Sequence, residues 1–295
     1  MPDAASHLES GHLPIKFGYL KAHAHTEHAA STSYDATTHE LGLDHSAISS
    51  AVAHFPTMPE WVELGPGDGT YIRDVMLTLP ELPPRTLLLD FSRELLAISS
   101  LTLEAAGIHA TQSTQWDFEG QPTKAIRLWR QVDRAILVTL LGNTLANVES
   151  ETQVLLNIAN SMRRGDLLVI GVARATDEVG EAELLAPYRS VEFAAAVHSG
   201  LTSLGLEGCF DFDVSLRDGD IVGRTSVSRL TRVPSALGGA LRDGSIIRTF
   251  LSRRYTATRF AKVLESRSVF CIESLGESKT HLTAVVRRTG TSQHD

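Results

Sequence analysis

The segment EWVELGPGDGT, residues 60–70, decides the fold of this chain. Its first half is typical of a short buried strand, and its second half is a glycine-rich turn that precedes a helix beginning near Tyr71. Gly65, Gly67 and Gly69 lack a Cβ atom where the backbone must turn tightly and approach a ligand. A glycine-rich turn between a strand and a helix therefore predicts a nucleotide-binding site.

Apolar runs and helical segments alternate from residue 60 onward. We expect strands at 60–64, 85–91, 108–113, 134–141 and 166–173. We expect helices between them at 70–79, 92–106 and 149–163. Ser92 and Ser150 are the expected N-caps of the last two. This alternation predicts an α/β fold with a mainly parallel, doubly wound sheet, in which ligands bind at the carboxyl ends of the strands.

The alternation stops after Ala173, which indicates an inserted segment. Residues 181–204 are typical of one or two helices, and period-two patterns at 210–216 and 221–230 predict a β-hairpin. A strand is expected at 245–252, a helix at 256–266, and an antiparallel pair at 269–274 and 280–287. The expected parts are an N-terminal helical cap contributing to the substrate domain (1–55), a cofactor-binding Rossmann-like core (56–179), an α+β substrate-binding insertion (180–252), and a return to the core (253–295).

Composition argues against several classes of protein. The 295 residues are 42% hydrophobic and 21% charged, as in ordinary soluble globular proteins. The net charge of −8 argues against a nucleic-acid partner. No apolar run approaches the ~20 residues that span a bilayer, and residues 1–16 do not resemble a signal peptide. Two cysteines are too few for a disulfide framework. We expect a cytoplasmic enzyme with a small-molecule substrate and no membrane partner.

Histidines are dense near the N-terminus, with His23, His25 and His28 in the run HAHTEH. A metal site built on one helix needs histidines at i and i+4 together with a further ligand. This run has neither that spacing nor the spacing of a zinc finger. We therefore predict a polar segment and no metal site.

Asp90 ends an apolar run about 25 residues after the first predicted strand, where an acid accepts hydrogen bonds from ribose hydroxyls. This acid fits both a dinucleotide and S-adenosylmethionine (SAM), and three other features choose between them. The turn has the pattern Gly-x-Gly-x-Gly, whereas the dinucleotide fingerprint places its third glycine three positions after the second. Asp117 and Phe118 follow the third strand, where class I methyltransferases bind adenine, and a closing hairpin is usual for those enzymes. These features favour SAM.

Five segments carry a family resemblance: ELGPGDG at 63–69, DFS at 90–92, DFE at 117–119, LGNTLAN at 141–147 and GSIIRTFLSRRY at 244–255. Together they resemble the histidine Nα-methyltransferases of ergothioneine biosynthesis, from about residue 13 to residue 287. The last segment is the most specific, because it is similar to a signature near the end of that family's substrate-binding insertion. The resemblance implies a class I SAM-dependent methyltransferase with a substrate-binding insertion.

The resemblance also implies which residues bind the cofactor. They are Gly65, Gly67, Gly69, Asp90, Phe91, Asp117 and Phe118. By this resemblance the glycine turn lies against the methionine end of SAM, Asp90 holds the ribose, and Asp117 with Phe118 holds adenine.

Three candidate catalytic residues follow from the same resemblance. Asn147 would hold the polar head of a substrate amino acid, and Tyr188 would contact its carboxylate. Tyr34 matches an N-terminal tyrosine near the amine. Two of them also have a structural alternative, since Asn147 can instead cap the helix that begins near Glu149 and Tyr188 can be a core aromatic residue.

One departure from the family pattern concerns the substrate. The family has an acid at the position of Phe250, which acts with the hydroxyl matching Ser252 to bind the imidazole of histidine. A phenyl ring accepts no such hydrogen bond, and an unpaired buried polar group costs ~1–3 kcal/mol, so we expect that histidine is not the substrate. An aromatic pocket suits an apolar side chain or a cation. The family pattern's second glycine is Ala146, and its lysine after the turn is Tyr71.

Three functions remain open at this point. The first is SAM-dependent methylation of a small amine or amino acid other than histidine. The second is cyclisation of SAM's own aminobutyrate chain, which releases methylthioadenosine. The third is a non-catalytic SAM-binding subunit that has lost its acceptor site.

Overall fold

The chain divides into two units in the structure, a computed structural model that describes residues 4–22, 40–109, 111–132, 134–176, 178–237 and 239–290. Unit 1 comprises Met1–Tyr34 and Asp177–Arg254. Unit 2 comprises Asp35–Thr176 and Tyr255–Asp295. The chain therefore leaves unit 2 near residue 177 and returns to it at residue 255.

A seven-stranded sheet forms the centre of unit 2 within the described residues, in the order β3-β2-β1-β4-β5-β10-β9. The strands are β1 (Glu60–Leu64), β2 (Thr86–Asp90), β3 (Thr111–Gln115), β4 (Ile136–Leu140), β5 (Leu167–Ala173), β9 (Phe270–Glu277) and β10 (His281–Arg288). The first five run parallel to one another, and β10 is antiparallel to both of its neighbours, β5 and β9. The predicted α/β, doubly wound fold is confirmed.

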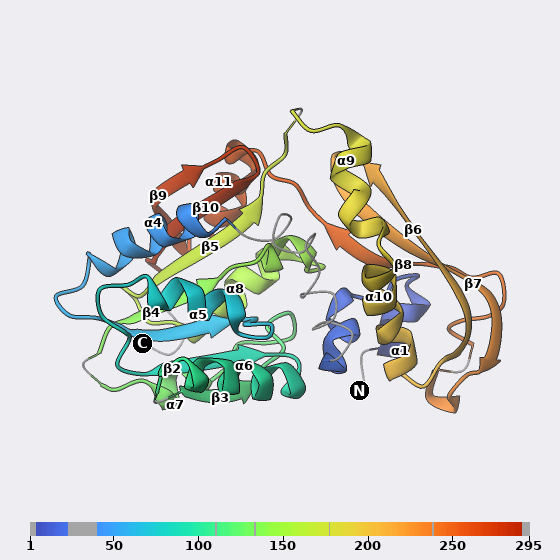
Figure 1. Ribbon diagram of the computed structural model, residues 1–295, viewed down its shortest axis with the longest axis horizontal. Helices are drawn as coiled ribbons and strands as arrows, with labels where there is room; N and C mark the ends of the chain where they lie inside the picture. The colour runs from blue at the N-terminus through green and yellow to red at the C-terminus, as the bar shows by residue number, and fades with distance from the viewer. Residues whose placement is uncertain are drawn as a thin grey trace. The chain divides into compact units, whose positions relative to one another are not determined.

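Helices cover both faces of this sheet (Figure 1). They are α4 (Leu41–Val52), α5 (Thr70–Leu77), α6 (Arg93–Ala105), α7 (Ala125–Trp129), the 3-10 helix η2 (Thr144–Asn147), α8 (Glu151–Ser161) and α11 (Ala257–Glu265). Trp61 packs with residues of α4, α5 and α6, whereas Val62 packs with residues of α7, α8 and α11. Neighbouring residues of a strand point to opposite faces, so β1 contributes to both cores.

Unit 1 contains a three-stranded antiparallel sheet in the order β6-β7-β8. The strands are β6 (Glu207–Arg217), β7 (Asp220–Arg232) and β8 (Ile246–Ser252). The helical segments are α1 (Ala4–Glu9), η1 (Ile15–Leu20), α9 (Glu181–Leu185), η3 (Ala186–Arg189), α10 (Val191–Ser203) and η4 (Ser235–Leu237). A Cβ atom on Gly18 would lie 2.6 Å from the carbonyl oxygen of Ala196, so this glycine lets η1 approach α10 closely.

The expected helix caps are present. The Ser92 hydroxyl accepts a hydrogen bond from the Leu95 amide, and the Ser150 hydroxyl accepts one from the Gln153 amide. These bonds satisfy amide groups that have no partner within their own helix. The predicted starts of α6 and α8 are therefore correct to within two residues.

The third strand was predicted three residues too early, at 108–113 instead of 111–115. Ile108 is buried, but it belongs to the connection that follows α6. The strand itself has the polar sequence TQSTQ and is largely exposed at the edge of the sheet. The prediction was wrong because hydrophobicity marks buried strands and does not mark an edge strand.

The expected N-terminal part, residues 1–55, is divided between the units at Tyr34 and Asp35. Helix α4 belongs to unit 2, where Ile48 and Ala51 are buried in a core cluster of the sheet. Tyr34 and the histidines His23, His25 and His28 lie outside the described residues. Of the helices that the structure describes, none combines the length and apolar character needed to cross a membrane.

Candidate cofactor and substrate site

The glycine turn after β1 has a backbone that only glycine adopts without strain. Gly65, Gly67 and Gly69 have φ angles of 68°, 57° and 83°. The amide of Gly65 donates to the carbonyl of Leu89 over 2.8 Å, which ties the turn to β2. A Cβ atom on Gly69 would lie 2.8 Å from the Cα atom of Ser99. The turn is thus held against α6, and this close approach leaves no room for a side chain at position 69.

Asp90 is the last residue of β2 and is buried. Its Oδ1 atom accepts a hydrogen bond from the Ser92 amide over 2.7 Å. Burial raises the pKa of Asp90 to about 6, and hydrogen bonds from the backbone of Ser92 and Phe91 partly offset this effect. Asp90 thus stands at the carboxyl end of β2, the position from which an acid reaches a ribose.

Asp117 and Phe118 follow β3 in a turn that is anchored on both sides. The Asp117 Oδ1 atom accepts the Glu119 amide, and the Phe118 carbonyl accepts a hydrogen bond from the Asn157 side chain over 2.8 Å. The ring of Phe118 packs edge-on against Trp116, with 5.9 Å between the ring centroids. The ring also packs against the core cluster that includes residues of α8.

Asn147 ends the 3-10 helix η2, which begins just after the carboxyl end of β4. It does not cap α8, because Ser150 does so. Its Oδ1 atom is buried and accepts no hydrogen bond from any residue in the described part of the chain. An oxygen in this state can accept a hydrogen bond from a bound molecule.

Two buried carboxyl groups lie close to the glycine turn and were not singled out in the sequence. Glu63, on β1, accepts hydrogen bonds from the Trp61 indole and the Thr139 hydroxyl. Burial raises the pKa of Glu63 to about 8. Asp44, on α4, also carries a raised pKa because it is buried, and the nearby Glu40 carboxylate adds to this effect.

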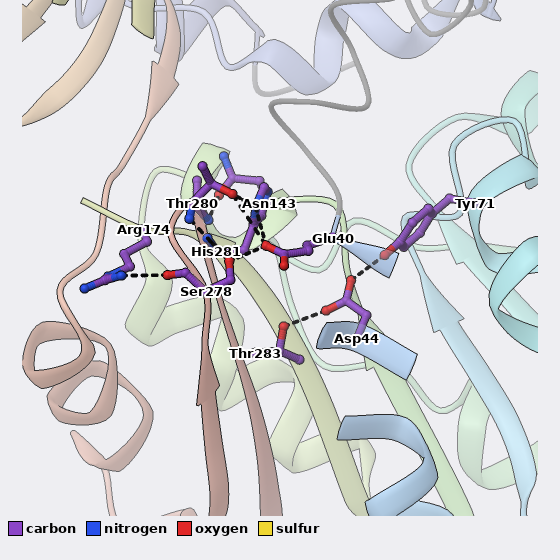
Figure 2. Close-up of polar contacts among 10 residues, drawn as sticks. Glu40, Asp44, Tyr71, Asn143, Arg174, Ser278, Thr280, His281 and Thr283 are labelled. Atoms are coloured by element: carbon purple, nitrogen blue, oxygen red, sulfur yellow. Dashed lines mark hydrogen bonds and ion pairs between the residues drawn. The ribbon is translucent and has the colours of Figure 1, made fainter. Parts of the chain in front are cut away.

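Asp44 links three elements, as Figure 2 shows. It accepts the Tyr71 hydroxyl over 2.7 Å and the Thr283 hydroxyl over 2.6 Å. A Cβ atom on Gly171 of β5 would lie 3.2 Å from the Asp44 Oδ1 atom, so this glycine makes room for the carboxylate. Asp44 shares one side of α4 with the buried Ile48 and Ala51, at i, i+4 and i+7, and an acid in such a position indicates a buried polar partner.

A second cluster of polar side chains surrounds Glu40, the residue immediately before α4 (Figure 2). The Glu40 carboxylate accepts a hydrogen bond from the Ser278 hydroxyl. It lies 3.6 Å from Nδ1 of His281, which is only 5% exposed. His281 begins β10 opposite Ala173, the last residue of β5. His281 and Glu40 therefore lie at the end of the sheet where the parallel strands have their carboxyl termini, as the glycine turn does.

Unit 1 holds the aromatic residues expected near the substrate. Phe250 is 4% exposed, and its ring centroid lies 5.2 Å from that of Tyr188 and 4.8 Å from that of Phe193. The Tyr188 hydroxyl accepts a hydrogen bond from Nη2 of Arg254 over 2.8 Å. Ser252 is fully buried on β8. The aromatic rings therefore pack on one another, and Tyr188 has both a core contact and a polar partner.

The predicted residues fall into two groups. Unit 2 brings together the residues predicted to bind the cofactor and Asn147, at or just after the carboxyl ends of β1, β2, β3 and β4. Unit 1 brings together Tyr188, Phe250 and Ser252. Among the described residues, no group of His, Cys, Asp and Glu side chains has the arrangement of a metal site.

The fold and this site define the class of protein. Five parallel strands continued by an antiparallel hairpin, with a glycine turn after β1 and an acid at the end of β2, form the cofactor-binding core of a class I SAM-dependent methyltransferase. The family model for histidine-specific, SAM-dependent methyltransferases matches residues 18–195, more than half of the chain. The chain belongs to this family, its cofactor is SAM, and the family resemblance seen in the sequence is confirmed.

Solved structures of similar architecture have low sequence identity to this chain. A SAM-dependent methyltransferase from Aquifex aeolicus is 8% identical, with coverage of 89% of this chain and 96% of that chain and a TM-score of 0.46. The N-methyltransferase NodS from Bradyrhizobium japonicum, in complex with S-adenosyl-L-homocysteine, is 10% identical, with coverage of 90% and 97% and a TM-score of 0.44. A comparison with curated protein sequences finds no match. The family assignment therefore rests on residues 18–195.

Proposed function

We propose that this protein transfers the methyl group of SAM to the nitrogen of a small amine or amino acid, and that histidine is not its acceptor. The observation that carries the specificity is Phe250, which replaces the family's acid and is packed against Tyr188 and Phe193. An imidazole N–H facing a phenyl ring would lose its hydrogen-bond partner at a cost of ~1–3 kcal/mol. That cost corresponds to a loss in affinity of roughly 5- to 150-fold.

The contact between Arg254 and Tyr188 supports an acceptor that carries a carboxylate. Arg254 is buried, and its guanidinium donates to the oxygen of Tyr188. Because that oxygen already accepts a hydrogen bond, the tyrosine's own proton is directed toward another acceptor. A hydroxyl proton beside a buried guanidinium suits a carboxylate, which makes charge-assisted hydrogen bonds. This supports an amino acid over an amine without a carboxylate.

SAM supplies a methyl group on a sulfonium sulfur, which leaves as a neutral thioether. Asp90 would hold the ribose, Asp117 with Phe118 the adenine, and the Gly65–Gly69 turn the methionine end. The remaining work of the protein is to orient the acceptor nitrogen in line with the methyl group, ~3 Å from it. Only a neutral amine has the lone pair for this attack, so a group of the protein or a water molecule must first accept a proton. Asn147 would orient the amine through its Oδ1 atom.

Product analysis tests the proposal. The purified protein is incubated with SAM and a panel of amino acids and amines, including histidine, and products are identified by mass spectrometry. We expect S-adenosylhomocysteine and a methylated product with an acceptor other than histidine. Histidine as the best acceptor would overturn the proposed specificity. Methylthioadenosine formed without any acceptor would support the cyclisation reaction in place of methyl transfer.

Substitution of Phe250 tests directly whether the loss of the family's acid at this position excludes histidine. Phe250→Glu restores an acid, so histidine methylation should rise relative to that of the wild type. Phe250→Leu is the matched control, because it removes the ring without adding a hydrogen-bond acceptor. Thermal unfolding of both variants shows whether the aromatic cluster tolerates the exchange. If the folded Phe250→Glu and Phe250→Leu variants methylate histidine at the same rate, the side chain at this position does not set specificity.

A further inference from the structure

We infer that His281, positioned by Glu40, accepts the proton of the acceptor amine. This inference rests on the proposed methyl transfer and names a group for its proton step. In this step the amine's proton passes to Nε2 of His281, and the freed lone pair forms the new N–C bond. The C–S bond breaks and its electrons stay on sulfur. The products are S-adenosylhomocysteine, a methylated ammonium group and an imidazolium.

The position of His281 in the sheet is the first argument. It opens β10 opposite Ala173, which ends β5. The Ala173 amide donates to the side-chain oxygen of Asn143 over 2.8 Å, and Asn143 lies in the loop between β4 and η2. His281 is therefore tied through Ala173 to Asn143, the residue directly before η2, which ends at Asn147. The carboxyl ends of β4 and β5 are where ligands bind in sheets of this kind.

The hydrogen bonds at Nδ1 are the second argument. Nδ1 of His281 lies 2.9 Å from the hydroxyl oxygen of Thr280, and that hydroxyl lies 3.5 Å from the Glu40 carboxylate. In the tautomer with a proton on Nδ1, the imidazole donates to Thr280 and Thr280 donates to Glu40. Nε2 then carries the lone pair that can accept a proton. Glu40, 3.6 Å from Nδ1, stabilises the imidazolium that forms.

Both members of the pair are held in place. The Ser278 hydroxyl donates to Glu40 and accepts the amide of His281 over 3.1 Å. The Ser278 carbonyl accepts a hydrogen bond from Nη1 of Arg174 over 2.6 Å (Figure 2). A base that is oriented by a carboxylate and by a fixed turn needs little reorganisation when the amine arrives.

The charged groups on the elements packed against His281 favour the imidazolium on balance. Glu40 is the nearest carboxylate, and Asp44 lies one helical turn further along α4. Arg174, at the end of β5, contributes a positive charge whose guanidinium is bonded to the Ser278 carbonyl. Glu277 and Lys279, on β9 and the following turn, are exposed, so solvent screens them.

The main experiment compares the pH profile of methyl transfer in the wild type, His281→Asn and His54→Asn. His54 is the matched control, because it also lies near a glutamate, with Nε2 4.0 Å from Glu273. We expect His281→Asn to lose roughly 100-fold or more in kcat and to lose the ionisation that limits the wild-type rate. The Kd for SAM, measured by calorimetry, should stay within about threefold. His54→Asn should behave as the wild type does.

A second measurement does not depend on turnover. The imidazole of His281 is titrated by NMR in the wild type and in Glu40→Gln, with and without SAM. Removal of the Glu40 charge should lower the pKa of His281. If the wild type methylates no acceptor, the proposed function fails and this inference fails with it. If methyl transfer is seen but His281→Asn keeps its rate and pH profile, or Glu40→Gln leaves the His281 titration unchanged, only this inference is overturned.

Discussion

The Tyr71 hydroxyl donates a 2.7 Å hydrogen bond to the Asp44 carboxylate, across 27 positions of sequence. Tyr71 lies in the first turn of α5, directly after the glycine turn, and Asp44 lies in α4. The same carboxylate accepts the hydroxyl of Thr283 on β10. The two bonds to Asp44 therefore join α4 to α5, which follows the glycine turn, and to β10 of the closing hairpin.

Tyr71→Phe should lower the free energy of unfolding by about 1–2 kcal/mol, because it leaves a buried carboxyl group with one donor fewer. Urea denaturation at neutral pH measures the loss. Thr283→Val removes the other donor to the same group, so the two changes should not add in the double variant. Additive losses would show that the bonds do not share one carboxylate.

Glu63 should make the stability of the SAM-free protein fall with rising pH. Its pKa is raised from 4.5 to about 8 in the folded state, so its favourable contribution is complete below pH 4.5 and is lost as the pH rises toward 8. The slope from one such group is at most about 1.4 kcal/mol per pH unit. Glu63→Gln should remove this part of the slope in urea denaturation measured from pH 5 to 8. An identical slope in the variant would contradict the assignment.

SAM binding should weaken as the pH falls through about 6, because Asp90 must be ionised to accept hydrogen bonds from the ribose. At pH 5 about one Asp90 in ten is ionised, so the Kd should be roughly tenfold higher than at pH 8. Asp90→Asn should bind SAM roughly 10- to 100-fold more weakly at pH 8 and should lose this pH dependence. Calorimetry at several pH values measures both effects.

Gly69→Ala should be more destabilising than Gly107→Ala, although both glycines have positive φ angles, 83° and 78°. Each substitution has the same conformational cost of about 1–2 kcal/mol, because alanine disfavours a positive φ angle. A Cβ atom at Gly69 would also collide with Ser99, whereas one at Gly107 would meet no atom within 4 Å. Overpacking at Gly69 should add roughly 1–3 kcal/mol. Equal losses in thermal or urea unfolding would mean that the turn can move away from α6.

Arg254→Gln should raise the KM for an amino-acid acceptor by roughly tenfold or more, because it removes a buried charge beside Tyr188. The KM for an amine of similar size without a carboxylate should not change. Arg253→Gln is the matched control in the neighbouring, half-buried position. Equal effects on both acceptors would argue that Arg254 acts only on the packing of Tyr188.

Local patterns in the sequence predicted most of the elements. The strands β1, β2, β4 and β5 are buried and rich in large apolar residues, so their composition marks them. Ser92 and Ser150 mark the helix starts that they cap. The edge strand β3 was displaced in the prediction because it is polar. The short helix α7 and the 3-10 segments were not predicted, since elements of three to six residues carry too little periodicity.

The cofactor class was determined by the sequence alone, because the glycine turn, the acid that ends β2 and the acid that follows β3 act through local backbone geometry that nearby residues specify. The buried polar contacts were decided only by the tertiary structure. Glu40 and His281 lie 241 positions apart, and Asp44 and Thr283 lie 239 apart, so no local pattern relates them. Burial raises the pKa of Glu63 and Asp44, and burial exists only once the sheet and α4 have packed together.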